Sequence, residues 1–285
     1  MKLINHSHQN PTSFLLMGIP GPEASHFWIA FPFCSMYALA VLGNMVVLLV
    51  VHSEPVLHQP MYLFLCMLST IDLVLCTSTV PKLLALFWAK DAEINFGACA
   101  AQMFFSASWA CTNCFLLAAM GFDRYVAICA PLHYASHMNP TLCAQLVITS
   151  FLTGYLFGLG MTLVIFHLSF CSSHEIQHFF CDTPPVLSLA CGDTGPSELR
   201  IFILSLLVLL VSFFFITISY AYILAAILRI PSAEGQKKAF STCASHLTVV
   251  IIHYGCASFV YLRPKASYSL ERDQPVSYTH LRAHE

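Results

Sequence analysis

The chain has 285 residues, of which 58% are hydrophobic and only 9% are charged. Together with a mean hydropathy of +0.73, this composition excludes an ordinary soluble domain and predicts an integral membrane protein. The formal net charge of −2 and the lack of a basic cluster argue against nucleic-acid binding. The N-terminus shows no cleavable signal peptide, so we expect the first membrane span to direct insertion.

Six apolar segments are long enough to cross a bilayer as helices, which takes about 20 residues each. They run approximately over residues 27–51, 61–84, 99–128, 142–166, 199–228 and 240–262. The sequence therefore predicts an all-α membrane protein with a transmembrane bundle over residues 27–262. The polar residues 1–26 are expected to form a flexible extracellular tail.

The orientation of the bundle does not follow from the Lys and Arg residues, whose count in the loops leans towards an inner N-terminus. Two other features place the N-terminus outside. Asn5-His6-Ser7 is an N-glycosylation acceptor, and the cysteines of the loop over residues 167–198 need an oxidising compartment. Four spans separate the N-terminus from this loop, and an even number places both features on the same, outer face.

Polar side chains within the spans need partners, because lipid offers none. Asn44, in the first span, and Asp72, in the second, are expected to interact directly or through water or sodium. One interpretation is a structural hydrogen bond between two helices. The other is a polar centre that rearranges when the protein changes state.

Asp123, Arg124 and Tyr125 follow one another at the end of the third span. Cys99 lies 25 residues before Arg124, about 37 Å along a helix, so the span crosses the whole bilayer with Cys99 outside. One interpretation is that Asp123 and Arg124 merely end the helix and extend their side chains to the water interface. The other is that the two charges neutralise each other and can exchange this interaction for other partners, so that the pair acts as a latch.

The outer loop contains Cys171, Cys181 and Cys191, which with Cys99 allow three disulfide pairings. An alternative takes His174, His178, Cys181 and Asp182 as ligands of copper or zinc. Since Cys181 is expected to be oxidised, we predict neither a metal site nor a cofactor.

Several strings resemble the olfactory receptors, a family of rhodopsin-type G-protein-coupled receptors. They are residues 120–129 followed by Pro131-Leu132-His133-Tyr134, the inner turn over residues 57–62, the helix-two string 68–72, the run 238–247, and residues 14–21 of the tail. The family usually has Ala and Tyr where this chain has Gly121 and Phe122. The resemblance implies a rhodopsin-like bundle of seven helices and no enzyme active site.

The resemblance also assigns roles to residues. The switch that couples to the G protein comprises Asp123, Arg124, Tyr125, Tyr220 and Lys238, beside the polar centre of Asn44 and Asp72. The implied disulfides are Cys99–Cys181 and Cys171–Cys191. The ligand site between the third, fifth and sixth spans comprises Ser106, Ala110, Cys111, Cys114, Leu204, Val208, Tyr254, Ala257 and Tyr261, for which plain helix packing is the alternative.

The implied function is an odorant receptor at the plasma membrane. It binds a small volatile molecule in the bundle and activates a stimulatory, olfactory-type G protein that raises cyclic AMP. A six-span transporter or channel is a remote alternative, because such proteins need broken or charged helices at the midplane and show repeats. Beyond Asp72 the sequence offers neither.

The pattern breaks after the sixth span. Residues 263–275 resemble the third outer loop of the family, but only the polar residues 276–285 follow, too few to cross a membrane. Those ten residues resemble a translated sequencing adaptor, so we expect a C-terminally truncated receptor with six of the seven helices and a non-native tail. Up to about Phe105 the sequence resembles the fish-like class I olfactory receptors, and from Ser106 on it resembles the tetrapod class II group. This change suggests a chimera joined near residues 102–105. A non-functional fragment retained in the endoplasmic reticulum is therefore the main alternative.

Overall fold

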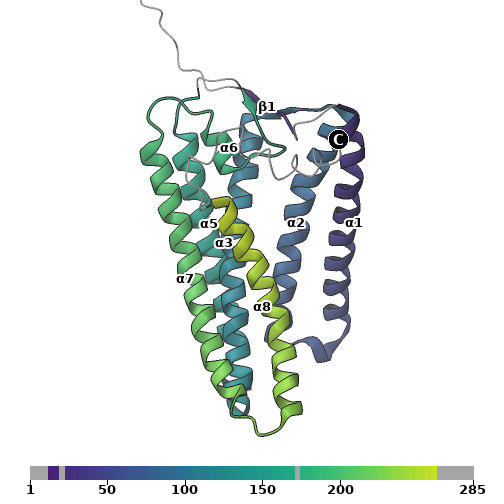
Figure 1. Cartoon of the computed structure of the whole chain (residues 1–285), viewed down its shortest axis with the longest axis vertical. Coiled ribbons are helices and arrows are strands. Elements are labelled where there is room, and N and C mark those ends of the chain that lie inside the picture. Colours follow the sequence, from purple (N-terminus) through teal and green to yellow (C-terminus); the bar gives the residue numbers. More distant parts are fainter. Residues whose placement is uncertain (1–11, 19–22, 171–173, 262–285) are drawn as a thin grey trace, which may run out of the picture.

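The structure is a computed structural model that describes residues 12–18, 23–170 and 174–261. Long helices lie side by side along one axis and form an elongated bundle (Figure 1). These helices are α1 (Glu23–Ser53), α2 (Pro60–Ala89), α3 (Phe96–Cys129), α5 (Pro140–Phe166), α7 (Gly195–Ile227) and α8 (Ala233–Tyr261). The prediction of a helical membrane bundle is confirmed, and each expected span lies within one of these helices or, at its end, within two residues of it.

Five of the helices, α1 from Trp28 onwards, α2, α3, α5 and α7, are long and apolar enough to cross a membrane. The sixth expected span forms α8, which is less apolar because it begins with Glu234, Lys237 and Lys238 and carries two histidines further along. The chain is thus a multi-pass membrane protein.

Local signals explain where the helices begin. The side chain of Asn95 accepts a hydrogen bond from the Gly97 N–H at 2.8 Å and caps α3, and Asn139 does the same for the Leu142 N–H at 2.9 Å at the start of α5. Proline at the first position of α2 and α5 fits a helix start, where its missing N–H costs nothing.

Helix α3 forms the centre of the bundle. In its most apolar 18-residue window 61% of the residues are buried, against 0% in α1. It packs most extensively against α5 and α7. Gly154 and Gly158 of α5 make this possible, because a Cβ on Gly158 would lie 2.7 Å from the Phe104 carbonyl oxygen and one on Gly154 2.5 Å from that of Ser108.

A small sheet covers one end of the bundle, where Figure 1 shows β1 above the helices. We call this end the outer end and the opposite one the inner end, after the orientation expected from the sequence. Strand β1 (Ser13–Leu16) is central, antiparallel to β2 (Glu93–Asn95) and parallel to β3 (Glu175–Ile176). Phe14 and Leu16 are each 1% exposed, whereas Leu15 between them is 42% exposed.

The expectation of a flexible tail is therefore wrong for residues 13–16. Alternation of buried and exposed side chains is the period of a strand, and the backbone groups of β1 are paired on both sides. Phe14 packs against Phe96 and Phe170, with both ring-centroid distances at 5.7 Å. Asn5 lies outside the described residues.

Short elements complete the loops. On the inner side these are the 3-10 turns Pro55–Leu57 and Pro131–His133 and the single-turn helix α4 (Tyr134–His137). In the second outer loop, helix α6 (Thr183–Leu187) follows β3. The loop is thus more regular than its lack of sequence periodicity suggested.

Candidate functional site

Asp123 and Arg124, the charged pair at the inner end of α3, have different surroundings and different hydrogen-bond partners. Asp123 is 1% exposed, and its carboxylate accepts a hydrogen bond from the Tyr134 hydroxyl at 2.7 Å. Burial, and then the neighbouring carboxylate, raise the pKa of Tyr134 above its ordinary value. The phenol therefore stays protonated and remains a donor to Asp123.

Arg124 forms no ion pair with Asp123 in the part of the chain that the structure describes. Its Nη2 donates to the sulfur of Met61, and its buried Nε has no partner there. The ion pair expected between Asp123 and Arg124 is thus absent from the described chain, and Asp123 is instead hydrogen-bonded to Tyr134 of α4. The reason is geometric, because consecutive residues of a helix do not face each other.

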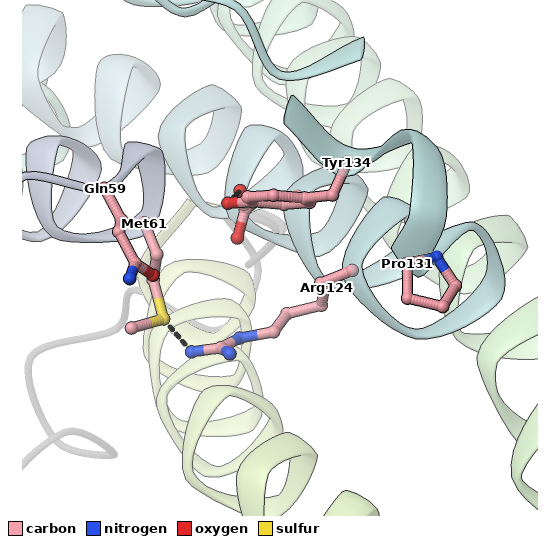
Figure 2. Close-up of a pocket in the computed structure, with 7 residues that line it drawn as sticks. Gln59, Met61, Arg124, Pro131 and Tyr134 are labelled. Carbon is pink, nitrogen blue, oxygen red and sulfur yellow. Dashed lines mark hydrogen bonds between the residues drawn. The ribbon is translucent and has the colours of Figure 1, made fainter. Parts of the chain in front are cut away.

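A cavity of about 310 Å³ opens beside Arg124. Figure 2 shows the guanidinium group extending towards Met61 and Gln59, with the Tyr134 ring on another side. The lining residues come from the start of α2, the end of α3 and the loop after it: Gln59, Met61, Asp123, Arg124, Ala127, Pro131 and Tyr134.

A second polar connection joins three helices. The Tyr220 hydroxyl of α7 lies 2.8 Å from Nδ1 of His246 in α8, and Nε2 of the same ring lies 3.1 Å from the Leu117 carbonyl oxygen of α3. A carbonyl only accepts, so Nε2 carries a proton and, in the neutral ring, Nδ1 accepts from the hydroxyl. The Tyr220 and His246 rings are also stacked, with centroids 5.7 Å apart.

Sequence reasoning singled out Tyr220 but missed His246 and Met61. The signal for His246 was present, because a histidine inside the apolar run after Lys238 must find partners at membrane depth. For Met61 there was no signal, since a methionine at a helix start is common as plain packing.

Of the other predicted switch residues, Tyr125 packs against the same apolar cluster as Tyr220, and neither Tyr125 nor Lys238 is hydrogen-bonded to Tyr220 or His246 in the described chain. Tyr125 packs against Phe122 and Tyr222, with ring centroids 6.1 and 5.7 Å apart. The Lys238 side chain is exposed, and no hydrogen bond or ion pair of its ammonium group occurs among the residues described.

Asn44 and Asp72 lie on adjacent helices but form no direct hydrogen bond in the described bundle. The Asn44 amide donates to the Ala40 carbonyl at 2.9 Å, within α1. Asp72 is half-buried in α2. The structure therefore contains no direct link between them, and an indirect one stays a prediction.

The predicted ligand residues separate into groups. Cys114, Val208, Tyr254 and Ala257 belong to one apolar cluster between α3, α7 and α8. Within it the Tyr254 hydroxyl donates to the Cys114 carbonyl at 3.4 Å, and His253 Nε2 lies 3.3 Å from the Cys114 sulfur.

The remaining predicted ligand residues lie around that cluster. Leu204 packs against a separate outer cluster, Cys111 is buried, and Ser106 and Ala110 are half-buried on α3. The Tyr261 side chain lies outside the described residues. Neither of the two cavities described here includes any of these residues, since the second, of about 350 Å³, is a lysine-edged apolar groove at the start of α8.

A disulfide joins Cys99 to Cys181, as the resemblance implies, and ties the second outer loop to α3. Because the Cys181 sulfur is bonded to Cys99, it is not available as a ligand in the alternative copper or zinc site. Cys191 is also disulfide-bonded; Cys171, its expected partner, lies outside the described residues.

Asp182, directly after that disulfide, is a buried carboxylate on the outer side. It accepts the Thr183 N–H at 2.8 Å and caps α6. Burial raises the pKa of Asp182 from 3.8 to about 6, although this hydrogen bond acts in the opposite direction.

The comparisons with known proteins agree with the architecture. The sequence model for the olfactory receptor family matches residues 33–268. Human olfactory receptor 10Z1 is 74% identical over 267 residues, 94% of this chain and 85% of the relative. Human olfactory receptors 10H2 and 52P1 are 46% and 45% identical over 98% and 92% of the chain, and over 89% and 81% of their own lengths.

The match to receptor 10Z1 is long enough to include residues 102–105, where a join was expected, so one relative resembles the chain on both sides of that point. The family match covers most of the chain, from within α1 to beyond the end of α8. The chain belongs to the olfactory receptor family and is therefore a helical membrane receptor of the class A G-protein-coupled type, not an enzyme.

Proposed function

We propose that the protein binds small volatile odorants between α3, α7 and α8 and activates a stimulatory, olfactory-type G protein at its inner end. This coupling raises the concentration of cyclic AMP in the cell. The receptor crosses the plasma membrane with its N-terminus outside. The observation that carries this proposal is the bridge from Tyr220 through His246 to the Leu117 carbonyl, which links the same three helices.

The bridge lies between the proposed ligand site and the proposed switch. Leu117 lies three residues after Cys114, about one turn of helix, and seven residues before Arg124, about two turns. A ligand that alters the packing of Cys114 and Tyr254 acts on α8 about two turns from His246. Apolar walls with a few polar groups suit a small volatile ligand.

The mechanism is a shift between two pre-existing arrangements. In the arrangement described here, His246 holds α8 against α3, and Tyr134 holds Asp123. An odorant that favours separation of α8 from α3 breaks the first contact and opens the inner end. Arg124, which has no carboxylate partner in the described bundle, then receives the C-terminal segment of the G protein.

The test replaces His246 with phenylalanine, which keeps a ring but removes both hydrogen bonds. A lost hydrogen bond costs about 1 kcal/mol, which favours the open arrangement about five-fold. His246→Phe should therefore raise ligand-independent cyclic AMP several-fold per receptor at the cell surface. The control is His52→Phe, an exposed histidine at the end of α1.

Surface labelling in the same cells separates coupling from trafficking, and a panel of volatile odorants is applied to the unmodified receptor. The proposal predicts that at least one odorant raises cyclic AMP and that His52→Phe behaves as the unmodified receptor. Unchanged basal signalling in His246→Phe at equal surface density would contradict the role of the bridge.

A further inference from the structure

The guanidinium group of Arg124 is poorly compensated for a charge at this depth. Arginine has five N–H donors and no acceptor of its own. In the described chain one terminal nitrogen donates to the thioether of Met61, a weak acceptor, while the buried Nε has no acceptor. A charged donor in such surroundings normally has an anionic or carbonyl partner.

The space for such a partner is present. The cavity of about 310 Å³ beside Arg124 falls in the range of small-ligand sites. Figure 2 shows the Arg124 side chain extending towards Met61, with Pro131 beyond its other end. Asp123 also lines it, but this carboxylate is almost fully buried and already accepts the Tyr134 hydroxyl. Neither charge forms an ion pair among the described residues, but the carboxylate has a hydrogen-bond donor in Tyr134, whereas the buried Nε of Arg124 has no acceptor.

We infer that this inner cavity is a binding site for a single oxyanion group, a phosphate or a carboxylate, seated on Arg124. The planar guanidinium offers parallel N–H groups that match two oxygens of such an anion. The anion comes either free from the cytosol or as the headgroup of an inner-leaflet phospholipid. When bound, it occupies the space beside Arg124 and hinders coupling to a protein partner.

This inference stands apart from the proposed function, because it requires only the cavity and the arginine. Its test is therefore direct binding, with neither odorant nor G protein present. The purified full chain, in nanodiscs of phosphatidylcholine, is titrated with inorganic phosphate at constant ionic strength. Binding is followed by phosphorus NMR line broadening and by the shift in thermal unfolding.

Two variants probe the site from different sides. Arg124→Gln removes the charge and should weaken phosphate binding about tenfold or more, as expected for a hydrogen bond to a charged group. Ala127→Phe fills the cavity with Arg124 intact and should weaken binding to a similar degree. Lys237→Gln is the control, since this exposed lysine lies at the same inner end but does not line the cavity.

A second set of nanodiscs carries a minor fraction of phosphatidylinositol bisphosphate, and retained lipid is counted by native mass spectrometry. Saturable binding of either source, lost in Arg124→Gln and Ala127→Phe but kept in Lys237→Gln, supports the site and identifies its source. Equal binding in all variants, equal loss in Lys237→Gln, or no binding of either source would overturn it. Folding of each variant is checked by its helical content and by the intact Cys99–Cys181 bond.

Discussion

Among the residues that the structure describes, the buried carboxylate of Asp123 accepts its one hydrogen bond from outside its own helix from the phenol of Tyr134. The bond is short, at 2.7 Å, and the donor belongs to α4, a helix of only one turn. At the residue scale, the state of the inner end therefore depends on whether Tyr134 remains docked on α3.

Tyr134→Phe should destabilise this docking, because it leaves the buried Asp123 carboxylate without its donor. The expected loss is about 1–3 kcal/mol, the cost of an unsatisfied buried acceptor. Thermal unfolding of the purified receptor measures it, with Tyr222→Phe as the control because Tyr222 is exposed and its hydroxyl has no bond within the described bundle. Equal unfolding temperatures for the two variants would rule out the role given to Tyr134.

Asp182 should make the stability of the outer loop depend on pH. Its pKa is about 6 when folded, above 3.8, so the folded state binds the proton more tightly than the unfolded state. This contribution is fully present below pH 3.8 and is lost as the pH rises through 6. Asp182→Asn keeps the capping oxygen and should flatten that dependence.

The measurement is the unfolding temperature between these two pH values. Asp193→Asn is the matched control, because Asp193 also caps a backbone N–H in the outer loop but is exposed. A pH dependence that survives in Asp182→Asn and vanishes in Asp193→Asn would contradict the assignment.

At the scale of elements, the contact between α3 and α5 rests on glycines that admit a backbone. Gly158→Ala would place its Cβ 2.7 Å from the Phe104 carbonyl oxygen. Relief of that overlap requires the helices to separate, at a cost of about 1–3 kcal/mol. Gly160→Ala should have little effect, because nothing lies within 4 Å of its Cβ. The unfolding temperatures of the two variants decide this, and equal shifts would show that the close approach is unimportant.

Strand β1 should contribute to stability through its buried face alone. Leu16→Ala removes a side chain that is 1% exposed and should cost about 2–5 kcal/mol. Leu15→Ala, one residue earlier on the exposed face, should change stability by less than about 0.5 kcal/mol. If both variants unfold at the temperature of the unmodified receptor, the strand does not hold the outer loop in place.

The long helices were predictable because each contains a continuous apolar run that can cross a bilayer. Such a run of about 20 residues is recognisable from the local sequence alone. Strand β1 was not predictable, because its partners come from β2 and β3, far along the chain, and four residues carry little local signal. The contact between Asp123 and Tyr134 was missed for a different reason. Both residues lie within a recognised run, but their pairing depends on how the loop after α3 folds back.

At the scale of the whole molecule, the outer and inner ends are built differently. The outer end is fixed by the Cys99–Cys181 disulfide and by a three-stranded sheet. The inner end is held by the hydrogen bonds of Tyr134 and His246 and contains the cavity beside Arg124. Covalent and sheet contacts resist opening more than single hydrogen bonds do, so we expect the structural change on activation to occur mainly at the inner end.

The most direct test of this account is nucleotide exchange on a purified stimulatory G protein, catalysed by the receptor in nanodiscs without ligand. The account predicts that His246→Phe accelerates exchange several-fold over the unmodified receptor, while His52→Phe leaves the rate unchanged. Equal rates for all three proteins, with each shown to be folded, would contradict the claim that the bridge from α7 through α8 to α3 restrains coupling.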